Sequence, residues 1–433
     1  MTQHVTPRRG RLLGFTAAGA AIALLAGCSA GNDTPEADVT PASSFTMVAP
    51  TSGSGETPAE LIAADYEAAT GVHIDVTAIP ADSYDSTVKT QLQGGSGADL
   101  IMVTGGKLFP TSVGPLVDAG LLRPLEGDAS AALMTPQTEA LFTGDDGTVY
   151  AQPTGTVVYG LVTNDATVAA STGSFPETFD DLLAGCTATA QNPAFLGLAG
   201  TTSSSTSIVV AELAANLVYA VDPEWNQKRA DGEVTFSDSD QWHAVFDTLT
   251  EMVDANCFQP GAEGAGFPDL VGGLMQGGIQ TVALPSLLLA ELSRQAGAEL
   301  PLSVQTLPAD SDGKALLIAQ PGSGLGINAD ADPSAQAAAQ DFLDWLAEPE
   351  NSATFAGYEG SIPAADLGDA SKIPAAFAAV ADQLAAGDYT YLPSSDWTNP
   401  EVSAAMGDGL TAILTGQGDT ASALAAMDAA WGA

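Results

Sequence analysis

Positively charged residues are scarce in this sequence. Its 433 residues include 11 lysines and arginines against 53 aspartates and glutamates, and the formal net charge is −42. A nucleic-acid-binding protein needs a basic surface to neutralise phosphates, so this class of function is excluded. The carboxylates are scattered and form no calcium-loop pattern, which favours a surface suited to acidic or salty surroundings over an ion-binding site.

The motifs of common enzyme classes are also missing. Only two histidines, His73 and His243, follow the first 28 residues, and they lie far apart. No G-x-S-x-G, H-E-x-x-H, P-loop or C-x-x-C pattern occurs. Acidic pairs are too numerous for one to stand out as a glycosidase pair. We therefore expect no enzyme, no metal and no cofactor, and a secreted glycoside hydrolase is the enzymatic alternative.

The N-terminus has the build of a secretory signal. Arg8, Arg9 and Arg11 precede an apolar run over 12–26, which is shorter than the about 20 residues that a membrane-spanning helix needs. The letters LAGC at 25–28 resemble the bacterial lipobox, in which the cysteine is lipidated and becomes the new N-terminus. We expect a signal peptide over 1–28 and a lipid on Cys28 that anchors the protein to the outer face of the cell membrane. The arginine pair leaves the Sec and twin-arginine export routes both open.

Residues 29–44 are small, polar and acidic, with two prolines. Such a segment buries too little apolar surface to offset the entropy of ordering it. It is predicted to be a flexible tether between the anchor and the folded part.

Two cysteines, Cys186 and Cys257, remain beyond the leader. Two thiols in an oxidising compartment usually pair. Both lie late in predicted helices. The loop-entropy model predicts that a bridge over this span adds roughly 4 kcal/mol to the free energy of unfolding. We expect a disulfide, the alternative being two separately buried thiols.

Strand-like and helix-like segments alternate from residue 45 onward. A short apolar strand over 45–50 precedes a helix start, where Thr57 can cap, Pro58 suits the first position and Glu60 completes a capping box. Strands over 72–78 and 99–104 follow, with a helix between them. This order is typical of a parallel sheet covered by helices.

Seven segments occur in an order and spacing that resemble the extracellular solute-binding proteins of ABC importers, particularly the carbohydrate-type family 1. They are 61–76 (LIAADYEAATGVHIDV), 92–100 (LQGGSGADL), 116–125 (LVDAGLLRPL), 150–164, 176–182 (PETFDDL), 275–283 and 360–364 (GSIPA). Each motif alone is weak, but the ordered set behind a lipobox is specific.

The resemblance implies a two-lobed periplasmic-binding-protein-like α/β fold. Each lobe would be a sheet flanked by helices, with the ligand in the cleft between them. One lobe would comprise 45–154 plus 323–367, and the other 155–322 plus 368–433. The function implied is that of a monomeric binding protein that delivers a small polar solute, a sugar before other classes, to the permease of an ABC transporter. A polyol, an amino acid derivative or an anion is the alternative solute.

The resemblance also points to candidate ligand-binding residues at loops and helix ends. They are Ser52, Gly53 and Ser54 after the first strand, Gly105, Gly106 and Lys107 after the third, Thr154 at the hinge, Ser203, Ser204 and Thr206 in a hydroxyl-rich turn, Ser286, and Trp397 as an aromatic plate for a sugar. The alternatives are an ordinary loop for 52–54, a solvent-facing charge for Lys107, a helix N-cap for 203–206 and core packing for Trp397.

Two positions depart from the family pattern. The stretch 283–288 lacks the aromatic residue that sugar-binding members often carry, and the third strand has Val103 where an aromatic residue often stands. Both departures weaken the sugar assignment without affecting the binding-protein assignment.

Overall fold

The computed structural model describes residues 39–51, 55–107, 109–127, 129–296, 301–309, 315–397 and 399–432. These residues belong to one compact unit, 39–433. The predicted signal peptide, Cys28, most of the tether, and Ser52, Gly53 and Ser54 lie outside the described residues. Among the helices that are described, none combines the length and the apolar character that crossing a membrane would require.

The first sheet has five strands in the order β2-β1-β3-β10-β4. They are β1 (Ser44–Thr51), β2 (His73–Pro80), β3 (Leu100–Thr104), β4 (Gln152–Pro153) and β10 (Ser323–Ile327). β1 pairs in parallel with both β2 and β3, as the alternating pattern predicted. β10 runs antiparallel to β3 and β4, because the chain returns to this sheet from the opposite direction.

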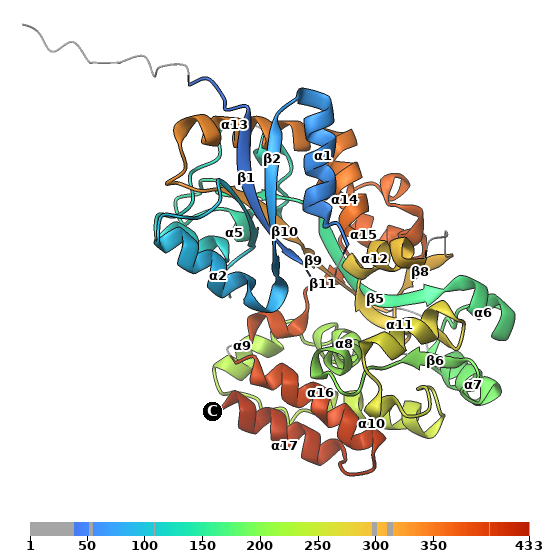
Figure 1. Cartoon of the computed structure of the whole chain (residues 1–433). Coiled ribbons are helices and arrows are strands. Elements are labelled where there is room, and N and C mark those ends of the chain that lie inside the picture. Colours follow the sequence, from blue (N-terminus) through green and yellow to red (C-terminus); the bar gives the residue numbers. More distant parts are fainter. Residues whose placement is uncertain are drawn as a thin grey trace, which may run out of the picture. The chain divides into compact units, whose positions relative to one another are not determined.

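Helices cover this sheet and close its core (Figure 1). They are α1 (Pro58–Thr70), α2 (Ala81–Gln93), α3 (Val113–Asp118), α4 (Ala129–Ala132), α5 (Pro136–Phe142), α13 (Pro333–Leu346) and α14 (Pro349–Glu359). The predicted start of α1 is confirmed, since Thr57 and Glu60 form a reciprocal capping box and Pro58 is the first helical residue. The helix ends at Gly71, whose φ of 80° favours glycine.

The second sheet is mixed, with the order β11-β9-β5-β7-β6 and β8 paired to β5. Its strands are β5 (Thr156–Asn164), β6 (Ala194–Gly197), β7 (Ile279–Pro285), β8 (Leu302–Gln305), β9 (Leu317–Pro321) and β11 (Tyr389–Thr390). β6 and β7 are parallel, and so are β9 and β11. β5 runs antiparallel to β7, β8 and β9.

Both faces of the second sheet are buried. Along β5, Leu161 belongs to one core while Val158 and Val162 belong to the other, as the two-residue period of a strand requires. The helices are α6 (Asp165–Ser171), α7 (Phe179–Thr189), α8 (Ser203–Ala214), α9 (Trp225–Ala230), α10 (Asp240–Asp254), α11 (Phe267–Met275), α12 (Leu287–Ala296), α15 (Ala381–Ala386), α16 (Glu401–Leu414) and α17 (Thr420–Trp431). Helices α8, α16 and α17 lie side by side in one of these layers (Figure 1).

The chain passes between the two sheets at three places that lie together. The first joins β4 to β5, the second joins β9 to β10, and the third follows α14. The Gly322 N–H donates to Gly155 O (2.8 Å), and Thr156 and Ile362 exchange two backbone hydrogen bonds (2.7 and 2.9 Å). A Cβ on Gly155 would lie 2.6 Å from Ser361 Oγ, so the crossing is tightly packed.

This arrangement of two sheets, each covered by helices, confirms the predicted fold class. Ile362 and Leu367 pack in a core of the second sheet, although the sequence analysis grouped residues up to 367 with the first. The reason is that Ile362 pairs with Thr156 at the start of β5. The other lobe boundaries stay predictions.

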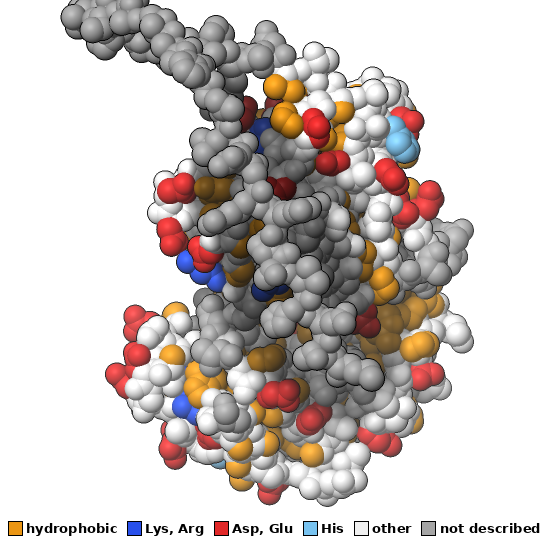
Figure 2. All heavy atoms as spheres, turned by 60° about the vertical axis from the view of Figure 1, so that its left-hand side comes forward, with side chains coloured by type: hydrophobic (Ala, Val, Ile, Leu, Met, Phe, Trp, Pro, Cys, Tyr) orange, Lys and Arg blue, Asp and Glu red, His pale blue; other side chains and the backbone are white. Residues whose placement is uncertain are grey.

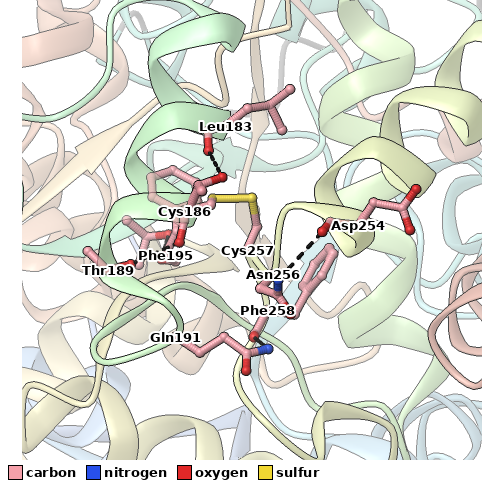
Figure 3. The surroundings of a disulfide bond; sticks show 11 residues. Leu183, Cys186, Thr189, Gln191, Phe195, Asp254, Asn256, Cys257 and Phe258 are labelled. Carbon is pink, nitrogen blue, oxygen red and sulfur yellow. Dashed lines mark hydrogen bonds between the residues drawn. A yellow bond between two sulfur atoms is a disulfide. The ribbon is translucent and has the colours of Figure 1, made fainter.

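A disulfide joins Cys186 near the end of α7 to Cys257 just after α10 (Figure 3). The Cα atoms lie 4.7 Å apart, within the reach of a disulfide. Both cysteines are fully buried, and Phe195 and Phe258 lie beside them in the same core. The bond ties α7 to the segment that follows α10, and its two cysteines are separated by 71 positions in the sequence.

Candidate ligand-binding site

A cavity of about 220 Å³ lies at the carboxyl edge of the first sheet. It is lined by Pro50, Ala81, Tyr84, Asp85, Met102, Val103, Thr104, Phe109 and Ser323. The parallel strands β1 and β3 both end at this edge, and the carboxyl ends of parallel strands are where open α/β sheets bind ligands. The topology therefore marks this cavity as the candidate site.

Tyr84 joins the strands behind the cavity. Its buried hydroxyl donates to Met102 O (2.6 Å) and lies 3.2 Å from Val48 O. Burial raises the pKa of this phenol above its usual value, so the hydroxyl keeps its proton. The bond fixes α2 against β1 and β3, and with it the next residue, Asp85.

Asp85 is the carboxylate among the residues that line the cavity. It is half-buried on α2, and it accepts a hydrogen bond from the hydroxyl of buried Thr111. One oxygen is thereby held in place, and a carboxylate has further lone pairs for a ligand's hydroxyl or amine donors.

Phe109 is the aromatic residue of the loop that follows β3, and 43% of it is exposed. Its N–H donates to Ser112 Oγ (2.9 Å), and the Ser112 N–H donates back to Phe109 O (2.9 Å). Because Ser112 is buried, the backbone that bears the ring is fixed. The sequence analysis missed Phe109 and Asp85. The available signal was an apolar triplet, 108–110, directly after the polar loop.

The predicted residues after β3 lie close to this cavity but do not line it. Gly106 has a φ of 77°, and its N–H donates to Leu141 O (2.8 Å), while Gly105 packs against Leu141 and Phe142. Lys107 is mostly exposed, with its Nζ 3.3 Å from an Asp145 carboxylate oxygen. The arrangement matches the solvent-facing alternative for Lys107.

Thr154 lies buried at the crossing between the sheets, where its hydroxyl donates to Ser323 O (3.0 Å). The buried carboxyl of Glu359 faces Thr154 and the hydroxyl of Ser361, whose Oγ lies 3.3 Å from Glu359 Oε2. Burial raises the pKa of Glu359 to about 7. Thr154 therefore belongs to the hinge, where a titratable carboxyl adjoins it.

Ser203, Ser204 and Thr206 lie in the first turn of α8, whose N-cap is Thr202, so none of the three is the N-cap that the alternative proposed. The Ser203 hydroxyl donates to Asp408 Oδ1 (2.6 Å), and Ser204 is exposed. Thr206 is fully buried, with its hydroxyl donating to Ser203 O (3.0 Å), so its assignment as a ligand contact is wrong.

Ser286 is also misassigned. It is fully buried, its hydroxyl accepts from the Val158 N–H (3.2 Å), and its own N–H donates to Val158 O (2.7 Å). These bonds hold the end of β7 against β5. The side chain has no face left for a solute.

Trp397 is a core residue and not an aromatic plate. It is 3% exposed and packs edge to face with Phe236, with ring centroids 5.8 Å apart. Trp242 and Trp431 complete its surroundings at 6.2 and 6.4 Å. Its indole N–H donates to Asn226 Oδ1 (3.0 Å), which satisfies its polar atom. Trp397 is therefore unsuited to bind a solute, because its ring is buried and its N–H already has an acceptor.

The predicted residues thus form separate groups. Gly105, Gly106 and Lys107 adjoin the first-sheet cavity, and Ser203 and Ser204 lie at the start of α8. All residues that line the 220 Å³ cavity belong to the first sheet, its loops and helix α2. The predicted convergence of both groups on one cleft stays a prediction.

A larger cavity, of about 680 Å³, lies on the second sheet. It is bounded by the end of β5 at Asn164 and by the segments that precede β6 and β7. The amino ends of the parallel pair β6 and β7 thus face it, which is the opposite edge from the one that binds ligands in such sheets. We assign no ligand to it.

Acidic side chains are spread over the visible face of the molecule, and basic ones are few (Figure 2). Over the described residues, no group of three or more histidine, cysteine or acidic side chains is placed to hold a metal ion.

Solved structures share this fold over nearly the whole chain. A chitin oligosaccharide binding protein has 17% sequence identity and a TM-score of 0.68, covering 90% of this chain and 98% of its own. The GacH receptor of Streptomyces glaucescens has 15% identity and a TM-score of 0.66, covering 90% and 97%. A family 1 extracellular solute-binding protein from Bifidobacterium longum subsp. infantis has 19% identity and a TM-score of 0.64, covering 91% and 99%.

Sequence comparison supplies the family. No curated protein sequence matches the chain. A family model does match, over residues 62–367, which is more than half of the sequence. The chain therefore belongs to the family of bacterial extracellular solute-binding proteins.

Proposed function

We propose that this protein is the substrate-binding lipoprotein of an ABC importer and that its solute is a sugar. It captures the solute outside the cell and delivers it to a membrane permease. The observation that carries the proposal is the cavity at the carboxyl edge of the first sheet, beside the triple crossing to the second sheet. A solute held at such an edge can be enclosed when the two sheets rotate about the crossing.

Two similar structures support the sugar as the solute class. One of them is a chitin oligosaccharide binding protein, and the other, the GacH receptor, has been solved in complex with acarbose. The cavity here offers a carboxylate and an exposed aromatic ring, which suit the hydroxyl groups and the apolar face of a sugar.

The family is extracellular, so the protein is exported. We propose that Cys28 carries the lipid that keeps it at the outer face of the membrane, on the strength of the LAGC letters behind a basic and apolar leader. The intact mass of membrane-extracted protein tests this. An unmodified Cys28, or cleavage elsewhere, would refute it.

The chain's role is binding and not turnover. The family consists of solute-binding receptors, and the sequence lacks the nucleophile and metal motifs of hydrolases. The cavity holds one carboxylate, Asp85, whereas glycoside hydrolysis ordinarily uses two. Incubation with common glycosides should release no product, and steady product release would establish the hydrolase instead.

A thermal-shift screen tests the solute class directly. The panel contains neutral sugars, polyols, amino acids and anions. A ligand at a hundred times its dissociation constant adds about 2.7 kcal/mol to the free energy of unfolding, which is a readily measured rise in melting temperature. We expect a neutral sugar to give the largest rise. A response confined to amino acids or anions would contradict the sugar assignment while keeping the binding function.

A further inference from the structure

We infer that Glu359 couples the closing of the two sheets around a solute to the release of a proton, so that solute binding strengthens as the pH rises. The inference rests on the proposed function in that it requires a solute, and it adds a regulation of that binding by pH. It depends on the place of one buried carboxyl group at the crossing between the sheets.

Glu359 is the last residue of α14, directly before the third crossing segment. Its Oε2 lies 3.3 Å from Ser361 Oγ of that segment, and its carboxyl faces the hydroxyl of Thr154 in the first segment. The hydroxyl and the N–H of Thr154 both donate to Ser323 O (3.0 Å each), at the start of β10, where the second segment ends. The carboxyl therefore lies where all three crossing segments meet.

The crossing is packed too closely for the sheets to rotate around an unchanged carboxyl. A Cβ on Gly155 would lie 2.6 Å from Ser361 Oγ and 2.7 Å from Ile362 O. Hinge closure is absorbed by changes of backbone torsion in a few residues of such a crossing. Rotation of the sheets must therefore displace Ser361 relative to Thr154, and the enclosure of Glu359 changes with it.

Burial favours the protonated form of this group. It raises the pKa of Glu359 to about 7, above the ordinary value of 4.5. The hydroxyls of Thr154 and Ser361 offset this rise only in part, because they offer hydrogen bonds but no positive charge. An arrangement that admits water to the carboxyl removes the burial and lowers the pKa, so the proton leaves.

The charged side chains around the end of α14 interact with groups other than Glu359. Asp65 on α1 accepts from the Tyr358 hydroxyl (2.8 Å), Asp341 on α13 acts on the Tyr66 hydroxyl, and Asp366 pairs with Lys372 (3.4 Å). On α12, which also packs against α14, the side chains that the structure describes are apolar. Within the described residues, no acidic or basic side chain contributes to the pKa of Glu359, so its burial governs the proton.

The direction of the coupling follows from the first-sheet cavity. In the present arrangement, the described residues that line it belong to the first sheet, its loops and α2, and none belongs to the second sheet. Enclosing a solute therefore requires rotation about the crossing, which exposes Glu359 and releases its proton. Binding that releases a proton becomes stronger as the pH rises, because a lower proton concentration favours the deprotonated complex.

Titration calorimetry on the full chain measures the coupling. The probes are galactose, raffinose, maltotetraose and N,N′-diacetylchitobiose, neutral sugars that have no group titrating between pH 5.5 and 8.5. We expect the affinity for the best probe to rise at least about tenfold from pH 5.5 to 8.5, as a fall of one unit or more in the pKa of Glu359 requires. Titrations near pH 6.5 in phosphate and in imidazole, whose heats of ionisation differ, should show that sugar binding releases protons.

Glu359→Gln places a permanently neutral side chain at the crossing and should abolish both effects. Its sugar affinity should stay constant from pH 5.5 to 8.5, near the weaker low-pH value of the wild type. Glu348→Gln, at an exposed position before α14, is the matched control for the substitution. His73→Gln is the control for an exposed group that titrates in this range, because Glu67 raises the pKa of His73. Both controls should keep the wild-type pH dependence and proton release, and circular dichroism confirms that each variant is folded.

The possible outcomes separate this inference from the proposed function. Sugar binding that is independent of pH, that weakens as the pH rises, or that keeps its pH dependence in Glu359→Gln overturns the coupling and leaves the function standing. If no probe binds, the sugar function fails, and small-angle X-ray scattering of the ligand-free protein tests the coupling by itself. The wild type, unlike Glu359→Gln, should then have a smaller radius of gyration at pH 8.5 than at pH 5.5. An equal radius at both pH values in the wild type, or the same change in the variant, overturns the coupling.

Discussion

The aromatic side chains nearest the two predicted halves of the cleft differ in their exposure. At the first sheet, an aromatic side chain, Phe109, stays exposed beside a cavity. At the second sheet, the predicted aromatic side chain, Trp397, is buried in a cluster that contains four of the five tryptophans, Trp225, Trp242, Trp397 and Trp431, around Phe236. The difference teaches that a place in the chain near a predicted cleft does not decide where a side chain points. The side chain can instead be buried in a neighbouring aromatic core, as Trp397 is.

The largest expected effect comes from Trp397→Ala. Removing this indole from the aromatic core should lower the free energy of unfolding by about 3–5 kcal/mol, because a large cavity is left and the Asn226 bond is lost. Denaturant unfolding measures the loss. Sugar affinity of the folded variant should stay within twofold of the wild type, because Trp397 is buried in the core and does not line the first-sheet cavity. Weak binding with unchanged stability would restore Trp397 to the site.

The next largest expected effect on stability is that of removing the disulfide. The Cys186→Ala, Cys257→Ala double variant opens a bridge over 71 positions and should lose about 4 kcal/mol of stability by the loop-entropy model. Hydrogen exchange should increase in α7 and α10 and remain unchanged in β1 and β2, which separates the two sheets experimentally. Reduced wild type serves as the control. An even increase over both sheets would show that the bond stabilises the whole chain and not the second sheet alone.

The crossing between the sheets should make stability depend on pH through Glu359. Its pKa is about 7 in the folded protein, above the ordinary value of 4.5, because burial disfavours the charged form. The groups that face it are the hydroxyls of Thr154 and Ser361, and no charged group contributes to its shift. The folded state therefore binds the proton more tightly than the unfolded state.

The sign of the effect follows from this difference. The contribution of Glu359 to stability is constant below about pH 4.5, falls as the pH rises from there to about 7, and is lowest above that range. The decline amounts to roughly 3 kcal/mol. Glu359→Gln should remove this part of the slope, as measured by unfolding from pH 4 to 8. Identical slopes in variant and wild type would contradict the assignment. Glu348→Gln, an exposed position preceding α14, is the control.

The smallest effect is expected at the rim of the first-sheet cavity. Lys107→Ala removes an exposed pair with Asp145, so the free energy of unfolding should change by less than about 1 kcal/mol. Affinity for a neutral sugar should stay within twofold, because Lys107 does not line the cavity. A tenfold loss of sugar affinity would return Lys107 to the site. Asp145→Ala should match Lys107→Ala in stability.

Local sequence patterns, which extend over a few residues, were sufficient to predict much of this protein's structure. The capping box at Thr57 and Glu60 and the alternation of apolar segments depend on hydrogen bonds and side chains that are neighbours in the chain, and the sequence alone predicts them. The family could also be predicted, because its motifs are local and ordered. The disulfide between Cys186 and Cys257 could be predicted without the tertiary structure, because these are the remaining cysteines beyond the leader.

Only the tertiary structure decided which side chains line the candidate cavity and which are buried in a core. Trp397 is buried because Asn226 and Phe236, more than 150 positions away, surround it, and Glu359 is buried because Thr154 and the other crossing segments close over it. Asp85 and Phe109 meet at one cavity because β1 and β3 pair and bring their ends together. Burial depends on contacts between segments that are distant in the chain. No periodicity or local motif encodes those contacts, so the sequence places the backbone of the site but not its side chains.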